Sequence, residues 1–515
     1  MTEGIFIAIA LLYFLISGAL FLFGANFIYL AILSWHHGRR RQALPERPAL
    51  WPAVTVQLPI YNELYVAERV IRAAAALDYP LDLLEIQVLD DSTDETTTIV
   101  GNVVRQLQNE GLRITHLRRR RRTGFKAGAL QVGLEQANGE FIAIFDADFV
   151  PEPDFLKRAL PFIAPEPRVA FVQARWGHLN RDYSWITYLQ SLAIDAHFMV
   201  EQFARSQAGY WFNFNGTAGI WRKAAMVDAG GWRVGTLTED LDLSYRAYLR
   251  GWEGRFARDI EVRAELPVNF SAFRRQQHRW ARGSLECALQ LAPQVWATPI
   301  PLHRKIQATL HLTGYAVHLL LFALTLLYPL VVIFASAYPR FSVLYGLAYP
   351  FALTSLAPTI FFAMGQKHLG RSWFRLLPRV LLVSLVGSGL MVNTVRAAWQ
   401  IVRQPRGVFE RTAKFGIGAA SQDWTSKRYQ LQLDGIVILE LLMGLFSVAT
   451  AWWAWSAGVW GIAFYALLFG SGLILAASVT IAQSVTVYRG RRARSAQTRL
   501  ERELLQSGTA PENAL

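Results

Sequence analysis

The sequence RRQQHRWAR, from Arg274 to Arg282, lies downstream of a short acidic triplet, Thr238-Glu239-Asp240. Within it, Gln276, Arg279 and Trp280 form the pattern Q-x-x-R-W. Helical spacing places these three side chains on nearly one face of a helix. A polar and aromatic face close to carboxylates is typical of a binding site, whereas a single Q-x-x-R-W also occurs in ordinary amphipathic helices.

Further acidic residues lie upstream, where apolar runs end. The runs at 54–58, 86–89 and 141–145 are typical of buried strands, with Pro59 expected to end the first. Helical patterns follow near 67–77 and 94–107, and Ser92 or Thr93 is expected to be the N-cap of the second. Asp90-Asp91 closes the second run and Asp146-Ala147-Asp148 the third. Strands that alternate with helices predict an α/β domain with a mostly parallel sheet, in which ligands bind at the carboxyl ends of the strands.

The two ends of the chain are much more apolar than its middle. The run at 4–33 is longer than the apolar core of a signal peptide and long enough to cross a bilayer. Further runs of spanning length cover about 306–336, 343–364, 376–399, 433–455 and 460–488. We therefore expect an integral membrane protein with the α/β domain inserted between its spans.

Basic residues predict the orientation of these spans. Arg39, Arg40 and Arg41 follow the first run, which places the N-terminus outside and the middle of the chain in the cytoplasm. Basic residues also flank the run 376–399 on both sides, and one crossing cannot have both ends inside. We therefore predict an interfacial helix at 376–400 and about five spans, which leave the tail 489–515 in the cytoplasm.

Composition excludes several other classes of protein. The net charge of +14 suggests nucleic acid, but the Lys and Arg residues crowd beside apolar segments, as in membrane proteins. We therefore predict no nucleic-acid partner. The single cysteine, Cys287, excludes an intramolecular disulfide and a cysteine-based zinc site. A transporter or pore would need charged or broken spans around a midplane site, and few charges lie within the runs.

Asp146 and Asp148 are spaced so that one turn after a strand can aim both carboxylates at one point. Hard carboxylate oxygens suit Mg²⁺ or Mn²⁺. Such a cation would neutralise the charge that develops on a departing diphosphate. The pattern D-x-D alone is common in surface loops, so its position after a buried strand carries the prediction.

Together these motifs resemble the membrane-embedded inverting glycosyltransferases of family 2, which include cellulose and hyaluronan synthases. The segment NFNGTAGIWR, residues 213–222, and QQHRW, residues 276–280, are most similar to the cellulose-synthase-like mannan and glucan synthases of plants. The resemblance covers residues 54–281 and implies a cytoplasmic GT-A (Rossmann-like) domain within an α-helical transmembrane region. It implies a transmembrane helix at 1–35, a catalytic domain with interfacial helices at 36–300 and a transmembrane region at 301–488.

The resemblance also implies roles for individual residues. Asp240 matches the catalytic base, with Glu239 beside it to orient the acceptor. The residues that it implies for the donor are Tyr61, Glu63, Asp90, Asp91, Lys126, Asp146, Gln276, Arg279, Thr412 and Lys414. Those that it implies for the acceptor are Trp280, Gly216 and Thr217. The alternative interpretation of the motif from Asp90 to Asp94 is a helix cap with acids favourably placed at the helix N-terminus, and both interpretations can hold for Asp94. The alternative for residues 213–222 is a tight turn with packed aromatics.

Three segments keep two interpretations each. Residues 409–414, FERTAK, lie where the family has a gating loop of form F-x-V-T-x-K, within 403–430, although Arg411 replaces its Val; otherwise this is a basic loop that contacts lipid. Of the arginines 118–122, one or two would contact phosphate, and the others would face water or anionic headgroups. The helical pattern from Tyr183 to Phe203 fits an interfacial or a core helix.

The function that follows is a metal-dependent inverting hexosyltransferase. It would transfer a hexose from UDP-glucose or GDP-mannose to a growing β-1,4-glucan or mannan in the plasma or inner membrane, and extrude the polymer. The alternative is a glycolipid synthase that adds glucose to ceramide or diacylglycerol, since such enzymes share the acidic motifs. An inactive scaffold is disfavoured because no member of the catalytic set is missing.

Overall fold

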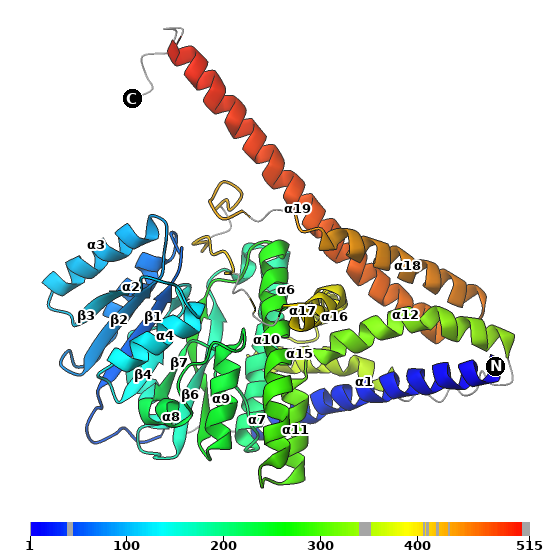
Figure 1. The fold of residues 1–515 in the computed structure, drawn as a ribbon, viewed down its shortest axis with the longest axis horizontal. Coiled ribbons are helices and arrows are strands. Elements are labelled where there is room, and N and C mark those ends of the chain that lie inside the picture. The colour runs from blue at the N-terminus through cyan, green and yellow to red at the C-terminus, as the bar shows by residue number, and fades with distance from the viewer. Residues whose placement is uncertain are drawn as a thin grey trace.

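The computed structural model describes residues 2–38, 45–338, 352–404, 407, 411–418, 422–430 and 433–506. An α/β domain occupies one side of the molecule, and the long helices α1 (Thr2–Gly38), α12 (Ala316–Ala337) and α18 (Ile436–Ser456) extend from it together (Figure 1). The expected separation into a polar middle and apolar ends is therefore a separation in space as well.

The domain is built on one eight-stranded sheet. Its strands are β1 (Val54–Ile60), β2 (Leu84–Asp90), β3 (Ile114–Arg118), β4 (Phe141–Ile144), β5 (Phe149–Val150), β6 (Val169–His178), β7 (Gly219–Arg222) and β8 (Glu253–Ala264). The strand order is β3-β2-β1-β4-β7-β6-β8-β5. β1, β2, β3 and β4 are parallel to one another, as are β6 and β8, whereas β7 runs against both of its neighbours and β5 runs against β8. The sheet is thus mixed, with its parallel half at the predicted strands.

Helices cover both faces of the sheet. They are α2 (Ala67–Ala75), α3 (Thr96–Asn109), α4 (Phe125–Gln136), α5 (Phe155–Ala159), η1 (Leu160–Phe162), η2 (Arg181–Tyr183), α6 (Trp185–Ala196), the π-helix η3 (His197–Gln202), α7 (Phe203–Gln207), α8 (Lys223–Asp228), α9 (Glu239–Leu249) and α10 (Phe270–Ala297). Alternate residues of β4 enter different cores: Ala143 packs with α2 and α3, and Ile142 and Ile144 pack with α4. Burial on both faces explains why these strands are apolar throughout.

Two local predictions at these elements were wrong. Pro59 lies within β1 rather than ending it, because β4 stops opposite Gln57 and the side of β1 to which the Pro59 nitrogen points has no neighbour there. Neither Ser92 nor Thr93 caps α3. The Ser92 hydroxyl accepts a hydrogen bond from the Asn62 amide, and Asp94 accepts one from the Thr96 amide instead.

The remaining helices are α11 (Leu302–Leu312), η5 (Leu353–Leu356), α15 (Ala357–His368), α16 (Leu377–Ser388), α17 (Met391–Arg403) and α19 (Trp460–Gln506). Among the residues that the structure describes, five helical stretches are long and apolar enough to cross a membrane: Gly4–Gly38, Ala316–Ala337, Leu377–Arg403, Ile436–Ser456 and Trp460–Gly490. The chain is therefore an integral membrane protein. By length and composition the stretch predicted to be interfacial qualifies as a candidate span, whereas the predicted span 343–364 lies partly outside the described residues.

The described part of the predicted span 343–364 and the predicted interfacial stretch 376–400 run in different directions in the structure. Residues 339–351 lie outside the described part of the chain, and η5 and α15 run beside α1 in the same direction, with Gly24 against Thr354 and Gly38 against His368. Figure 1 views α16 and α17 nearly end-on, whereas α1, α12 and α18 run across the view. The helix that was predicted to be interfacial thus crosses the bundle rather than following it.

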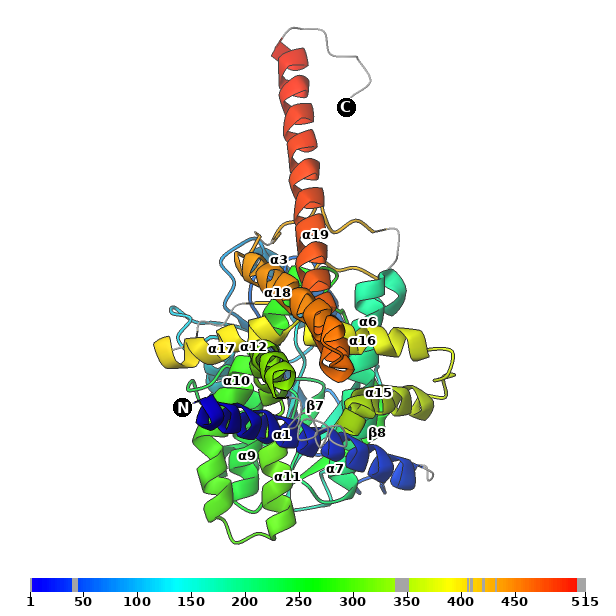
Figure 2. The same ribbon diagram turned by 90° about the vertical axis from the view of Figure 1, so that its right-hand side faces the viewer.

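The segment predicted as either interfacial or core begins with α6, most of whose residues are buried, and an interfacial position stays a prediction. Ser184 caps α6 with a capping box, and the helix packs against α15 and α16 through Ile186, Leu189 and Leu192. Figure 2 shows α6 close to these membrane-side helices. At the other end of the chain, α19 continues without a break into the predicted tail, as far as Gln506.

Candidate active site

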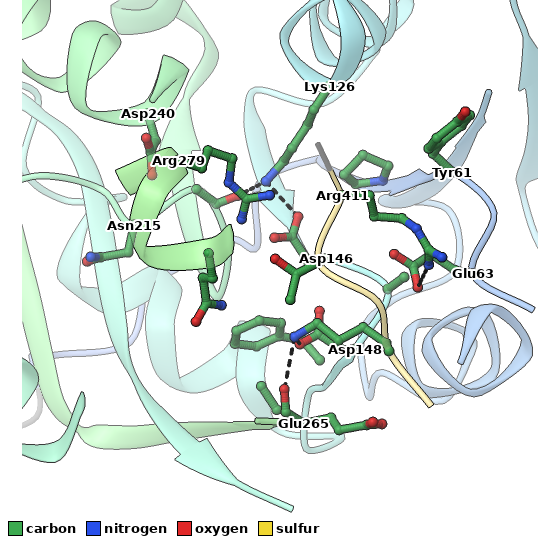
Figure 3. Close-up of a pocket in the computed structure, with 18 of the residues that line it drawn as sticks. Tyr61, Glu63, Lys126, Asp146, Asp148, Asn215, Asp240, Glu265, Arg279 and Arg411 are labelled. Atoms are coloured by element: carbon green, nitrogen blue, oxygen red, sulfur yellow. Dashed lines mark hydrogen bonds and ion pairs between the residues drawn. The ribbon is translucent and has the colours of Figure 1, made fainter. Parts of the chain in front are cut away.

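One cavity collects the motifs that the sequence singled out (Figure 3). Of the predicted site residues, it is lined by Tyr61, Glu63, Asp91, Lys126, Asp146, Asp148, Gly216, Glu239, Asp240, Gln276, Arg279, Trp280, Thr412 and Lys414. The two that do not line it are Asp90 and Thr217. The lining comes from segments between Pro59 and Lys414, which together span more than two thirds of the chain.

The parallel strands deliver the acidic side of the cavity. β1, β2 and β4 end on the same edge of the sheet, so Glu63, Asp91 and Asp146 follow one another across it. Asp240 arrives differently, in the first turn of α9, just after its N-cap Thr238. A helix N-terminus favours negative charge, which helps to keep this acidic turn together.

Lysines compensate the two carboxylates predicted to hold a metal. Lys126 Nζ lies 2.6 Å from Asp146 Oδ1, and Lys414 Nζ lies 2.5 Å from Asp148 Oδ2. Thr217 supports the first pair from behind, because its hydroxyl accepts a hydrogen bond of 2.9 Å from the Asp146 amide. Thr217 is fully buried, so it shapes the turn rather than the cavity wall.

Lys126 joins the metal side of the cavity to the base side. Its ammonium lies 3.7 Å from Glu239 Oε1 and donates to the Gly216 carbonyl at 3.0 Å. Burial alone would lower the pKa of Lys126, but the carboxylates of Asp146 and Glu239 outweigh it and raise that pKa. The lysine is therefore a fixed positive charge in the middle of the site.

Asp240 has the properties of a poised base. Burial, together with the neighbouring charge of Glu239, raises the pKa of Asp240 to about 7 against the pull of Lys126. Its Oδ1 accepts from the Leu241 amide at 2.9 Å, which leaves Oδ2 toward Gly216. Gly216 has φ +77°, and a Cβ there would lie 3.0 Å from Asp240 Oδ2. Glycine is thus required here by the backbone and by the space beside the carboxylate.

The helix α10 supplies the opposite wall through Gln276, Arg279 and Trp280. Its first turn is capped by Asn269, whose side chain accepts from the Ala272 amide at 2.8 Å. Burial lowers the pKa of Arg279, and the negative charges of Glu239, Asp146 and Asp240 oppose this shift. The predicted face therefore exists and points at the acidic cluster.

The neighbouring residues Asp90 and Asp91 have different surroundings: Asp91 lines the cavity, whereas Asp90 is buried. Asp91 lines the cavity and is held by Arg119 through Nε at 3.0 Å and Nη2 at 2.5 Å. Asp90 is buried and accepts hydrogen bonds from the Ser92 amide at 2.8 Å and from His116 Nε2 at 2.9 Å. Burial alone would raise the pKa of Asp90, but these bonds lower it. A direct contact with the donor remains a prediction for Asp91, whereas Asp90 shapes the strand end.

Two members of the arginine run lie at the cavity or beside it, and their contact with phosphate stays a prediction. Arg119 holds Asp91, and the Arg122 guanidinium lies 3.4 Å from the centre of the Tyr61 ring. Arg118, Arg120 and Arg121 are exposed beside β3, the edge of the sheet remote from the long helices (Figure 1). They face water, and this position does not favour the lipid-headgroup interpretation.

The gating-loop-like segment is folded into the cavity. Phe409 and Glu410 lie outside the described residues, but Thr412 and Lys414 line the site. Arg411, the departure from the family pattern, pairs with Glu63 at 2.8 Å. Burial raises the pKa of Glu63 to about 8 although Arg411 opposes the shift. Arg411, which replaces the Val of the family pattern, is thus paired with Glu63, an acidic residue that lines the cavity.

Glu265 is a site residue that the sequence analysis missed. It lines the cavity after β8, accepts from the Phe415 amide at 2.9 Å, and its carbonyl accepts from Lys414 Nζ at 2.9 Å. The available signal was an acid just after a strand, as at Asp91 and Asp146. Glu265 therefore seats the segment 411–418 on the domain.

Within the described residues there is no group of three or more His, Cys, Asp and Glu side chains that could hold a metal by itself. Asp146 and Asp148 nevertheless present two hard carboxylates to one cavity. Mg²⁺ is often bound by one or two carboxylates together with phosphate oxygens and water. The residues present thus fit a cation shared with a bound diphosphate.

Comparison with known proteins agrees with this geometry. Residues 52–283 match the sequence model of a family described as "Glycosyltransferase like family 2". Glucomannan 4-beta-mannosyltransferase 2 of Arabidopsis thaliana is 48% identical over 237 residues, 45% of this chain and 44% of that protein. Glucomannan 4-beta-mannosyltransferase 1 of Oryza sativa subsp. japonica is 45% identical over 240 residues, 45% of this chain and 46% of that protein. The matched part thus spans about half the length of these curated relatives.

Among solved structures, a mannosyltransferase from Pyrobaculum calidifontis in complex with GDP-Man and Mn²⁺ is 23% identical, with a TM-score of 0.46 over 69% of this chain and 99% of that chain. The family match, together with the mixed sheet flanked by helices, confirms the predicted GT-A architecture.

Proposed function

We propose a function from the premise that residues 52–283 belong to glycosyltransferase-like family 2: the chain is an inverting β-glycosyltransferase that transfers a hexose from a nucleotide sugar to a polysaccharide. One observation carries the proposal. A carboxylate with a pKa of about 7, a pair of carboxylates suited to a cation, and several cationic groups face one cavity. This combination serves a reaction that takes one proton and releases one diphosphate.

Asp240 is the proposed base. In the transfer, an acceptor hydroxyl oxygen forms a bond to the anomeric carbon while the bond from that carbon to the diphosphate oxygen breaks. The electron pair of that bond leaves with the diphosphate, and the hydroxyl proton passes to an Asp240 oxygen. A pKa near the working pH leaves a large share of this carboxylate ionised and still basic enough to accept a proton.

Cationic side chains would receive the diphosphate. Lys126 is held in the centre of the cavity, Arg279 approaches from α10 and Lys414 from the segment 411–418. Asp146 and Asp148 would hold Mg²⁺ or Mn²⁺, which when bound neutralises charge on the leaving group. On binding, the phosphate oxygens would take over lysine contacts that the two carboxylates now make.

The acceptor would lie between α10 and the loop before β7. Trp280 lines the cavity and offers a flat apolar face to a sugar ring, and Gly216 keeps the space beside Asp240 open. Glu239 lies close to both Lys126 and Asp240, where it would orient the acceptor.

The names of the curated relatives, glucomannan 4-beta-mannosyltransferases, favour mannose as the hexose and a β-1,4-linked mannan or glucomannan as the product. The donor would then be GDP-mannose, with UDP-glucose as the alternative. The five candidate spans beside the domain support a synthase that extrudes its polymer. We place the N-terminus outside and the domain and the tail in the cytoplasm of a plasma or inner membrane, as the basic flanks require.

A glycolipid synthase is the second candidate. It is favoured by one observation: α6 joins the domain to the membrane-side helices α15 and α16, and Ile194 of α6 lines the cavity, so that a lipid acceptor would have a short path to the site.

The test uses purified protein in lipid vesicles with Mn²⁺ or Mg²⁺ and labelled GDP-mannose or UDP-glucose in parallel. Label in a polymer that an endo-β-1,4-mannanase or glucanase cleaves supports the polysaccharide synthase and identifies the sugar. Label in an organic-soluble glycolipid supports the second candidate, and no transfer from either donor contradicts the proposal.

The same assay tests the base. Asp240→Asn should lower transfer by at least about 100-fold and leave nucleotide affinity unchanged, because an amide cannot accept the proton. Substantial turnover by this variant would contradict the role of Asp240.

A further inference from the structure

The first turn of α10, the helix that carries Gln276, Arg279 and Trp280, is bound by three helices of the membrane region. Arg274 Nη2 lies 2.7 Å from Glu440 Oε2 of α18 and donates to Thr480 Oγ1 of α19 at 2.9 Å. The Asn393 side chain of α17 donates to the Arg274 carbonyl at 3.1 Å. The first amide of α10 donates to the Gln483 side chain of α19 at 2.8 Å.

The pair of Arg274 and Glu440 is almost completely buried, with side chains 3% and 0% exposed. Removing two charges from water offsets most of their attraction, so such a pair adds little to stability compared with two apolar side chains. It does require a defined geometry, because each charge must meet its partner. Its main effect is therefore to fix how α10 sits against α18 and α19.

That placement bears directly on the candidate active site. Gln276 follows Arg274 by two residues, and Arg279 and Trp280 lie one turn further along the same rigid helix. Later on this helix, Gly283 packs against Thr238, where a Cβ would lie 2.5 Å from the Thr238 side chain. A small shift or rotation of α10 would move all three lining residues relative to Asp240.

We propose that Arg274 and Glu440 are positioning residues that let the membrane helices set the alignment of α10 with the catalytic carboxylates, an inference that rests on the proposed function. Neither residue lines the cavity, so neither touches donor or acceptor. The cluster lies near the starts of α10, α17 and α18, at the junction between the domain and the bundle. This polar contact set thereby joins the helix that carries Gln276, Arg279 and Trp280 to the membrane helices.

The experiment compares three full-length variants with the wild-type protein in vesicles. They are Glu440→Gln, the double variant Arg274→Met/Glu440→Met, and the control Arg371→Met. Arg371 also joins the membrane side to the domain, through Asp195 at 2.6 Å, but it contacts α6 rather than α10. In the control, Asp195 keeps its bonds to His178 and Gln366.

We expect Glu440→Gln to lower kcat about 10- to 100-fold, since misplacement of a catalytic constellation by about 1 Å has effects of this size. The affinity for the nucleoside diphosphate should fall much less than kcat, because Arg279 moves with α10 whereas Lys126 and Lys414, the other two proposed diphosphate contacts, do not lie on this helix. The double variant should recover the wild-type unfolding temperature, because no unpaired charge remains, but not the wild-type kcat. The control should retain kcat.

Normal kcat in the double variant would overturn the proposal, as would a loss of nucleotide affinity in proportion to kcat, which a merely structural role predicts. Hydrogen exchange separates this result from a failure of the proposed function. The amides at 270–283 should exchange faster in the double variant than in wild type or control, whether or not the protein transfers a hexose. Unchanged exchange there would also overturn the proposal.

Discussion

The substitution Glu239→Gln tests whether the acidic pair of α9 sets the pH dependence of transfer. The Glu239 charge is the second cause, after burial, of the raised Asp240 pKa of about 7. A glutamine has nearly the same shape but no charge. Without the like charge, Asp240 ionises more easily, so its pKa falls.

The size of the shift follows from Coulomb's law. Two unit charges about 5 Å apart, at an effective dielectric constant of about 20, repel by about 3 kcal/mol, equivalent to about 2 pH units. Lys126 lies 3.7 Å from Glu239 Oε1 and 2.6 Å from Asp146, so it neutralises part of this repulsion. We therefore expect a shift of about 1 pH unit.

The assay is the pH dependence of kcat/KM, which reports the groups of the free enzyme. In the wild type, transfer should fall as pH drops through about 7, because protonated Asp240 cannot act as a base. In Glu239→Gln this acidic limb should move down by about 1 pH unit, even if the plateau is lower because acceptor orientation is lost.

Glu253→Gln is the matched control, because Glu253 pairs with Arg255 away from the cavity. Its acidic limb should coincide with that of the wild type. A limb that stays fixed or moves upward in Glu239→Gln would refute either the assignment of Asp240 as the base or the electrostatic origin of its pKa.

Two further predictions concern the backbone and the metal. Gly216→Ala should lower transfer at least about 10-fold and destabilise the fold by about 1 kcal/mol. The control Gly251→Ala, at φ +89° with nothing within 4 Å of the added Cβ, should show only the loss of stability. Equal transfer in the two variants would contradict the crowding at Asp240. Asp148→Asn should weaken Mn²⁺ binding in the presence of a nucleoside diphosphate by about 10-fold, as measured by electron paramagnetic resonance. The control Asp154→Asn, at the N-cap of α5, should leave Mn²⁺ binding unchanged. Unchanged binding in Asp148→Asn would exclude that carboxylate as a ligand.

The acidic edge of the site could be predicted because it depends on local pattern. Apolar runs of strand length place Asp91 one residue after β2 and Asp146 two residues after β4, and parallel strands bring their carboxyl ends to one edge. The helical repeat of Gln276, Arg279 and Trp280 is equally local, and all three line the cavity. Such relations need no knowledge of distant contacts.

The division of labour between neighbouring residues was not predictable in this way. Asp90 and Asp91 look equivalent in the sequence, but Asp90 is the last residue of β2 and turns toward His116 of β3, while Asp91 faces the cavity. The roles of Glu265 and Arg411 in the site could not be predicted for a different reason. Each takes its role from a partner far away in the chain, Phe415 or Glu63, and no periodic pattern reports such a contact.

The contacts before α16 and after α17 bear on whether the stretch Leu377–Arg403 crosses the membrane. Before these helices, Arg371 pairs with Asp195 of the domain. After them, Lys414 pairs with Asp148, also of the domain. A segment that crosses the bilayer once must leave its two ends on opposite sides. Both ends of this segment are bound to the same domain, so we infer that Leu377–Arg403 lies along the interface although its composition would allow it to cross.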